Sequence, residues 1–293
     1  MYRELVSMSI DRIAMKSSTW AWDRQRESER VGLQLGEESI TDFLVLNLKK
    51  WGSGKLLVDT FTRRQESLNG ADWEWWLTDS SGKWLGMRVQ AKILNLKSAK
   101  YEHLHFKNKH GSQVETLLKD AKRHNLVPMY CLYSYWKFGT VKQAWKCKTH
   151  NPSIRHYGAS LLSPYQVKAF QTSGEKKLNS VATYLRPMHC LFCSSRKGTS
   201  DTGLAHKALD WLKDAELLAP TGIDAEGANA IEFTRDVQSE RVEKESSDSF
   251  VKTSPPHYVR ALQQGAENWQ ELNLANERLR RITIFTQTDE QST

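Results

Sequence analysis

The chain has 293 residues, a formal net charge of +8 and an apolar fraction of 39%. No apolar run approaches the roughly 20 residues of a membrane-spanning helix, and residues 1–16 carry acids and lack the apolar stretch of a signal peptide. Four cysteines in a chain of this length do not form a disulfide framework, so we expect a globular cytoplasmic protein that does not associate with membranes.

The positive charge is concentrated in the middle of the chain. Residues 137–197 hold eleven Lys and Arg against one acid, and residues 83–124 hold ten against three. Residues 198–249 reverse the balance, with twelve acids against five bases. A basic body followed by an acidic segment favours a protein that binds a polyanion. The alternative is that the charge serves only to keep the surface soluble.

The first half of the chain predicts alternating helices and strands. Residues 1–35 have helical apolar spacing followed by an Arg-rich connector, and form either a helix packed on the body or a partner-binding arm. Residues 36–51 predict a helix with Glu37 and Glu38 in its first turn, where the helix dipole favours acids. The next expected elements are strands over 55–64, 72–78 and 84–94, a helix over 112–125 and a buried strand over 126–136.

The second half has weaker signals. Residues 140–197 contain elements packed on the body, and residues 206–218 predict a helix. Residues 220–256 are poor in bulky apolar side chains and predict loop. Helical spacing then returns and ends in a short strand, RITIFTQ, at residues 281–287.

The hairpin within residues 70–94 carries the strongest chemical signal. Alternate residues of a strand face the same side, so Asp72 pairs with Glu74 and Gln90 with Lys92. If the two strands are neighbours, these side chains converge. Carboxylate and amide oxygens are ligands that Mg²⁺ prefers, and a lysine beside them stabilises the charge that develops when a phosphodiester is hydrolysed. Ordinary polarity on half-buried strands is the alternative.

These features resemble the PD-(D/E)xK nuclease superfamily. Asp72 stands on the second strand and Gln90-x-Lys92 on the third, and the Gln variant is similar to the Mrr-type branch of restriction endonucleases. GADWEWW with VQAK also resembles a bacterial family of restriction-endonuclease-like proteins. The resemblance covers roughly residues 36–136 and departs from the superfamily pattern where Gln90 replaces the usual acid. It implies an α/β fold with a restriction-endonuclease-like core, α-β-β-β-α-β, whose mixed central sheet is flanked by helices.

Carried over by position, the resemblance implies roles for the hairpin residues. Asp72 would be the main ligand of Mg²⁺ (or Mn²⁺), Gln90 the second ligand and Lys92 the catalytic lysine. Glu74, on the same face as Asp72, would be the ligand of a second ion.

A third acidic group is expected from one of several positions. Members often add a glutamate from the first helix, where Glu38 is the candidate and Glu37 its neighbour. Glu66, in the turn before the hairpin, competes for the role. Gln113, at the start of the helix over 112–125, could also reach the site, although an ordinary helix-start residue is the preferred interpretation.

Two further groups of residues are candidates for binding. The loop after the third strand carries four lysines suited to phosphate contacts, with a solvated loop as the alternative: Lys97, Lys100, Lys107 and Lys109. The pairs Cys147-x-x-His150 and Cys190-x-x-Cys193, the latter preceded by His189, have zinc-ligand spacing. Buried thiols acting as small apolar residues are the alternative for the cysteines.

The sequence thus predicts three regions: an N-terminal arm (1–35), a nuclease-like domain with a basic extension (36–197), and an acidic linker with a mostly helical C-terminal segment (198–293). The expected function is Mg²⁺-dependent endonucleolytic cleavage of DNA, with RNA left open and a role in bacterial anti-phage defence implied by resemblance alone. A catalytically decayed subunit that binds nucleic acid or partner proteins is the alternative, and a zinc-stabilised interaction protein is a third. Pairing into a homodimer and control by a regulatory partner protein stay open.

Overall fold

The computed structural model describes residues 8–52, 56–62, 73–108, 111–142, 145–193, 203–218, 250–266 and 281–288. Its main strands are β1 (Leu56–Thr62), β2 (Trp73–Thr78), β3 (Trp84–Ile93), β6 (Val127–Tyr133), β7 (Ala159–Leu162), β8 (Arg186–Pro187), β9 (Val251–Lys252) and β10 (Arg281–Gln287). Two short strands, β4 (Lys107–Asn108) and β5 (Gly111–Ser112), form a separate ribbon.

The helices lie between these strands along the chain. They are α1 (Ile10–Arg30), α2 (Glu37–Trp51), α3 (Gln113–His124), α4 (Pro164–Ser173), α5 (Leu178–Ala182), α6 (Leu204–Asp214) and α8 (His257–Gln263), with 3-10 helices η1 (Ile154–Gly158) and η2 (Met188–Phe192). Among the helices of these ranges, none combines the length and apolar character that crossing a membrane requires.

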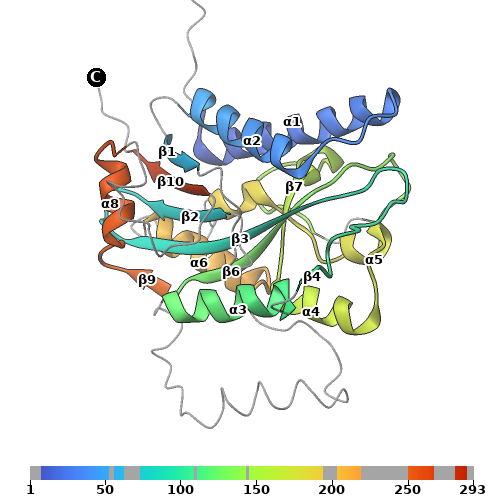
Figure 1. Cartoon of the computed structure of the whole chain (residues 1–293). Helices are drawn as coiled ribbons and strands as arrows, with labels where there is room; N and C mark the ends of the chain where they lie inside the picture. Colours follow the sequence, from blue (N-terminus) through green and yellow to red (C-terminus); the bar gives the residue numbers. More distant parts are fainter. Residues whose placement is uncertain are drawn as a thin grey trace, which may run out of the picture.

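The strands form one mixed sheet in the order β1-β10-β2-β3-β6-β7-β8, and β9 pairs with the start of β3. β2 and β3 are antiparallel, whereas β3 and β6 are parallel, and α3 makes the crossover between them. Helices cover both faces of the sheet, with α1 and α2 on one side and α3 and α4 on the other (Figure 1). The expected α/β class, with a mixed sheet flanked by helices, is confirmed.

The alternation along the central strands explains this layering. Trp75 and Val89 point to the face where α1, α2 and α6 pack, in one core with Leu44 and Leu209. The alternate residues of these strands, such as Trp76 on β2, point to the other face of the sheet, where α3, α4 and α8 pack. Because both faces of the sheet are covered, every residue of β2 is buried. This explains why most residues of its sequence, WEWWLT, are apolar.

The C-terminal strand, predicted at residues 281–287, is an internal strand of the sheet. β10 lies between β1 and β2, antiparallel to the first and parallel to the second. Ile282 and Ile284 pack with α8, and Phe285 joins the core on the opposite face. The described part of residues 198–293 therefore completes the same sheet as residues 56–133.

The first region is likewise part of the body. α1 buries Ile13, Ala14 and Trp22 against the rest of the chain, so its described residues form a packed helix and not a free arm. Gly158 shows how closely it packs: a Cβ there would lie 2.0 Å from Ser18 O and 2.4 Å from Trp22 N. Only glycine permits this approach between η1 and α1.

Candidate functional site

Polar side chains line one face of the β2–β3 hairpin. Trp73 pairs with Val89 and Glu74 with Arg88, so strand alternation places Glu74, Arg88, Gln90 and Lys92 on one face. Gln90 and Lys92 lie on β3 beyond its last pairing with β2, next to Tyr130 and Leu132 of β6. Asp72 and Glu66 lie outside the described residues, so their roles stay predictions from the sequence.

Lys92 is enclosed and faces a carboxylate. Its side chain is only 8% exposed, and its Nζ lies 3.9 Å from Oε2 of Glu37 in the first turn of α2. A cation this far out of water is stabilised by a nearby opposite charge. The structure therefore brings Glu37 to the predicted catalytic lysine, while the side chain of the neighbouring Glu38 is exposed.

Gln90 is held in a fixed orientation beside this lysine. It is 1% exposed, and its Oε1 accepts a hydrogen bond of 2.8 Å from Nε2 of Gln113, the first residue of α3. Its own Nε2 donates to the carbonyl oxygen of Ala91 at 3.1 Å. Gln113, the weakest of the sequence candidates, thus reaches the site through Gln90. A carboxylate of α2 therefore faces Lys92, and an amide of α3 holds the neighbouring Gln90.

Glu74, the expected ligand of a second ion, lies in a network of buried polar contacts. It is fully buried, and its Oε2 lies 2.5 Å from Nη1 of Arg88. Its Oε1 accepts hydrogen bonds from Nε1 of Trp76 at 2.5 Å and from the hydroxyl of Tyr258 at 2.8 Å. Both oxygens therefore lie against groups of the chain itself, and the expected role of Glu74 as ligand of a second ion stays a prediction from the sequence.

The partner of Glu74 extends this network. Nε of Arg88 lies 2.8 Å from Oδ2 of Asp120 on α3, and Tyr258 belongs to α8. The network therefore joins β2, β3, α3 and α8 on the same face as Gln90 and Lys92. No local pattern in the sequence marks Arg88, Asp120 or Tyr258, because their partners are distant along the chain.

The lysine-rich loop after β3 is on the surface. Lys97, Lys100 and Lys107 are exposed, and Lys109 lies outside the described residues. The backbone of Lys100 pairs with that of Lys177, which adds another exposed lysine. The pKa of His105 is lowered, first by burial and then by the charge of Lys176, as expected where positive charge gathers.

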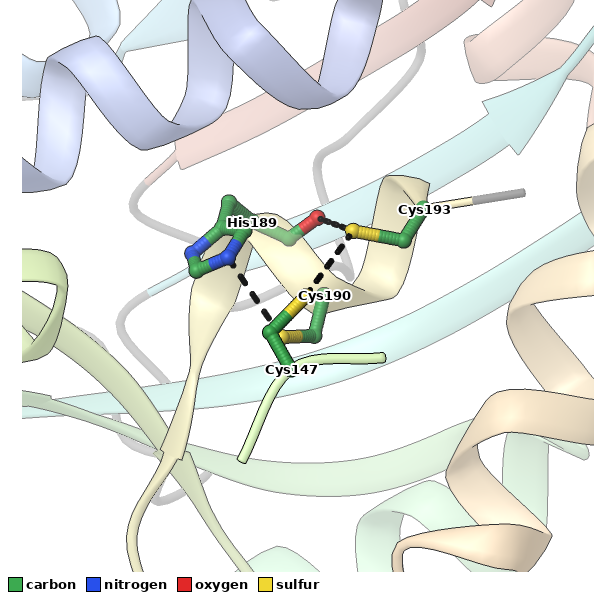
Figure 2. Close-up of side chains that lie close together, drawn as sticks. All are labelled: Cys147, His189, Cys190 and Cys193. Carbon is green, nitrogen blue, oxygen red and sulfur yellow. Dashed lines mark hydrogen bonds between the residues drawn. The ribbon is translucent and has the colours of Figure 1, made fainter. Parts of the chain in front are cut away.

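A second polar cluster consists of thiols and imidazoles. Figure 2 shows Cys147, His189, Cys190 and Cys193 converging, and one ligand atom from each lies within 4.8 Å of all the others. His150 approaches the same sulfurs, with its Nδ1 3.6 Å from Sγ of both Cys147 and Cys193. The four residues with predicted zinc-ligand spacing are therefore brought together, from the loop before η1 and from the region of η2.

An aromatic hollow opens near the end of β6. Its volume is about 620 Å³, and its lining includes Trp22, Tyr135, Trp136 and Phe138, of which Phe138 is 88% exposed. Basic side chains border it, but acids of α1 pair with them: Arg26 and Arg155 with Asp23, and Lys137 with Glu29. The hollow therefore offers stacking surface with little net charge.

Comparison with known proteins places no activity on these residues. A family model described as "Family of unknown function (DUF6615)" matches residues 10–291. Neither a curated protein nor a solved structure matches the chain.

Proposed function

The chain belongs to the DUF6615 family, a family of unknown function, and we propose from its own residues that it is a metal-dependent endonuclease that cleaves DNA. The observation that carries the proposal is the enclosure of Lys92 beside Gln90 and Glu37. The elements around them follow the order α2, β1, β2, β3, α3, β6, which supports the proposed restriction-endonuclease-like core. A role in anti-phage defence belongs to the proposal by resemblance alone.

The donor atoms of the site fit a hard divalent cation. Glu37 offers carboxylate oxygens and Gln90 an amide oxygen, and both are ligand types of Mg²⁺ and Mn²⁺. The proposed main ligand is Asp72, which immediately precedes β2 in the sequence. When bound, Mg²⁺ supplies Lewis-acid polarisation of the scissile phosphate.

The chain's own groups have distinct tasks in this proposal. Lys92 places a positive charge where the phosphate gains negative charge in the transition state, and Glu37 keeps that ammonium group in position. Gln113 donates to the single amide oxygen of Gln90, which keeps a second lone pair for a metal ion. The test is Mg²⁺-dependent cleavage of plasmid DNA and its loss in Asp72→Ala and Lys92→Ala.

Replacing Gln113 with leucine tests its positioning role. The substitution removes the donor to Gln90 Oε1 and is expected to raise the Mg²⁺ concentration for half-maximal cleavage by about 10–100-fold, as for other partners of metal ligands. Gln264→Leu, at an exposed position after α8, is the matched control and should leave the curve unchanged. If both variants show the same dependence of cleavage on Mg²⁺ concentration, Gln113 has no positioning role at the site.

The surface lysines are proposed to contact phosphates of the substrate. Changing Lys97, Lys100 and Lys107 together to glutamine should reduce the slope of log K for DNA binding against log salt by roughly 2.7, at about 0.9 for each lost contact on duplex DNA. The control is a second triple variant, with glutamine at the exposed residues Lys50, Lys119 and Lys122. It removes the same amount of charge from surfaces outside the loop. An equal fall in slope for both triple variants would show that only net charge matters.

The second candidate function is a subunit that binds nucleic acid but does not cleave it. Gln90 in place of an acid leaves less charge for a metal, and the hollow beside Phe138 offers aromatic faces of the kind on which single-stranded bases stack. Salt-sensitive DNA binding that Phe138→Ala weakens, without cleavage in Mg²⁺ or Mn²⁺, would favour this binding subunit over the nuclease.

A further inference from the structure

The thiol and imidazole cluster has the dimensions of a tetrahedral metal site. Sγ of Cys147 lies 3.8 Å from Sγ of Cys193, and Nδ1 of His150 lies 3.6 Å from each sulfur. Zinc bonds of about 2.3 Å to sulfur and about 2.0–2.1 Å to nitrogen place neighbouring ligands roughly 3.6–3.8 Å apart in a tetrahedron. These three atoms therefore already have the separations of ligands around one ion. A disulfide would require sulfurs about 2.05 Å apart.

Cys190 completes the set with a third sulfur. Its Sγ lies within 4.8 Å of the sulfurs of Cys147 and Cys193. The ligands then form two pairs, C-x-x-H and C-x-x-C, each with the short internal spacing that zinc sites use. Three thiolates and one imidazole in this geometry select zinc over Mg²⁺ or Ca²⁺, which prefer oxygen ligands.

Two histidines compete for the fourth position, and their second nitrogens distinguish them. Nε2 of His150 lies 2.9 Å from Oδ2 of Asp11, so a carboxylate holds the ring with Nδ1 toward the sulfurs. Histidine ligands of metals commonly have such a partner. In His189, Nε2 lies 3.5 Å from Sγ of Cys190, while Nδ1 is buried without a hydrogen-bond partner among the described residues. His150 is thus the better ligand, and His189 an N–H donor to the Cys190 sulfur.

We infer that Cys147, His150, Cys190 and Cys193 bind one structural Zn²⁺ ion, with Asp11 orienting His150. Asp11 lies in the first turn of α1, Cys147 and His150 in the loop before η1, and Cys190 in η2. The ion joins three segments that pack on one another and fixes α1 on the body. It is separate from the proposed Mg²⁺ site and does not depend on nuclease activity.

The metal content of the full chain tests the inference directly. Protein purified under reducing conditions should contain one zinc ion per chain by elemental analysis. Its zinc-edge X-ray absorption should fit three sulfurs at about 2.3 Å and one nitrogen at about 2.0–2.1 Å. A reduced chain that contains no zinc and takes up none from zinc chloride would overturn the inference, as would a ligand shell of oxygens.

Variants locate the ion without reference to activity. Cys193→Ala should lose zinc, whereas Cys131→Ala, at a buried cysteine of β6, should keep it. Because the Cys193→Ala chain can fail to fold, Asp11→Asn provides a milder change, with zinc affinity expected to fall about 10–100-fold in competition with a chelator. Unchanged affinity in Asp11→Asn, or loss of the nitrogen ligand in His189→Ala but not in His150→Ala, would contradict the assignment.

Discussion

Substituting methionine for Lys92 is expected to lower the rate of Mg²⁺-dependent DNA cleavage by a factor of about 10²–10³ or more, the usual effect of removing one group that stabilises transition-state charge. Methionine keeps most of the buried aliphatic stem and removes the ammonium group, whose Nζ lies 3.9 Å from Glu37. The measurement is the initial rate of plasmid cleavage at saturating Mg²⁺, with the melting temperature of the variant recorded alongside.

Lys83→Met is the matched control for this prediction. Lys83 lies in the turn of the same hairpin, at the end of β3 opposite Lys92. Its substitution should leave the cleavage rate within a small factor of the wild type. Equal rates for Lys92→Met and Lys83→Met, with both variants folded, would mean that Lys92 takes no part in the chemistry.

Replacing Arg88 with methionine is expected to reduce the free energy of unfolding by about 3–5 kcal/mol, because it leaves a buried charge without its partner. The side chains of Arg88 and Glu74 are both fully buried, and Nη1 of Arg88 lies 2.5 Å from Oε2 of Glu74. The loss also removes the contact with Asp120 on α3. Urea unfolding followed by tryptophan fluorescence measures the change.

An exposed ion pair on α1 is the control for the buried pair of Arg88 and Glu74. Arg24 and Glu27 on α1 are 2.8 Å apart but 41% and 47% exposed, so Arg24→Met should cost at most about 1 kcal/mol. Adding Glu74→Gln to Arg88→Met should recover part of the loss, since the unpaired charge is then gone. A cost for Arg88→Met no larger than that of Arg24→Met would show that the buried network does not hold these elements together.

The secondary structure of the central elements could be predicted because their signals are local. The strand expected at 84–94 is Trp84–Ile93, and the one expected at 281–287 has those bounds. Alternation along a strand also placed Gln90 and Lys92 on one face of β3, since side-chain direction within a strand follows from parity. These inferences needed no knowledge of distant contacts.

Positions set by distant contacts could not be predicted in the same way. Parity gave the face of Glu74 but not its partners, because Tyr258 approaches from a helix far along the chain. The choice between Glu37 and Glu38 depends on how α2 is rotated about its axis, and neighbouring residues of a helix point about 100° apart. The insertion of β10 between β1 and β2 is a pairing across more than 200 residues, for which its sequence has no local sign.

The central claim is that residues around β3 carry out Mg²⁺-dependent hydrolysis of DNA. Its most direct test is the incubation of supercoiled plasmid with the full chain in Mg²⁺ or in EDTA, together with Asp72→Ala and Lys92→Met. The proposal predicts nicked and linear products with Mg²⁺, none with EDTA, and severe loss in both variants. Cleavage that persists in both variants, or a folded wild-type chain that leaves the plasmid intact in Mg²⁺ and in Mn²⁺, would contradict it.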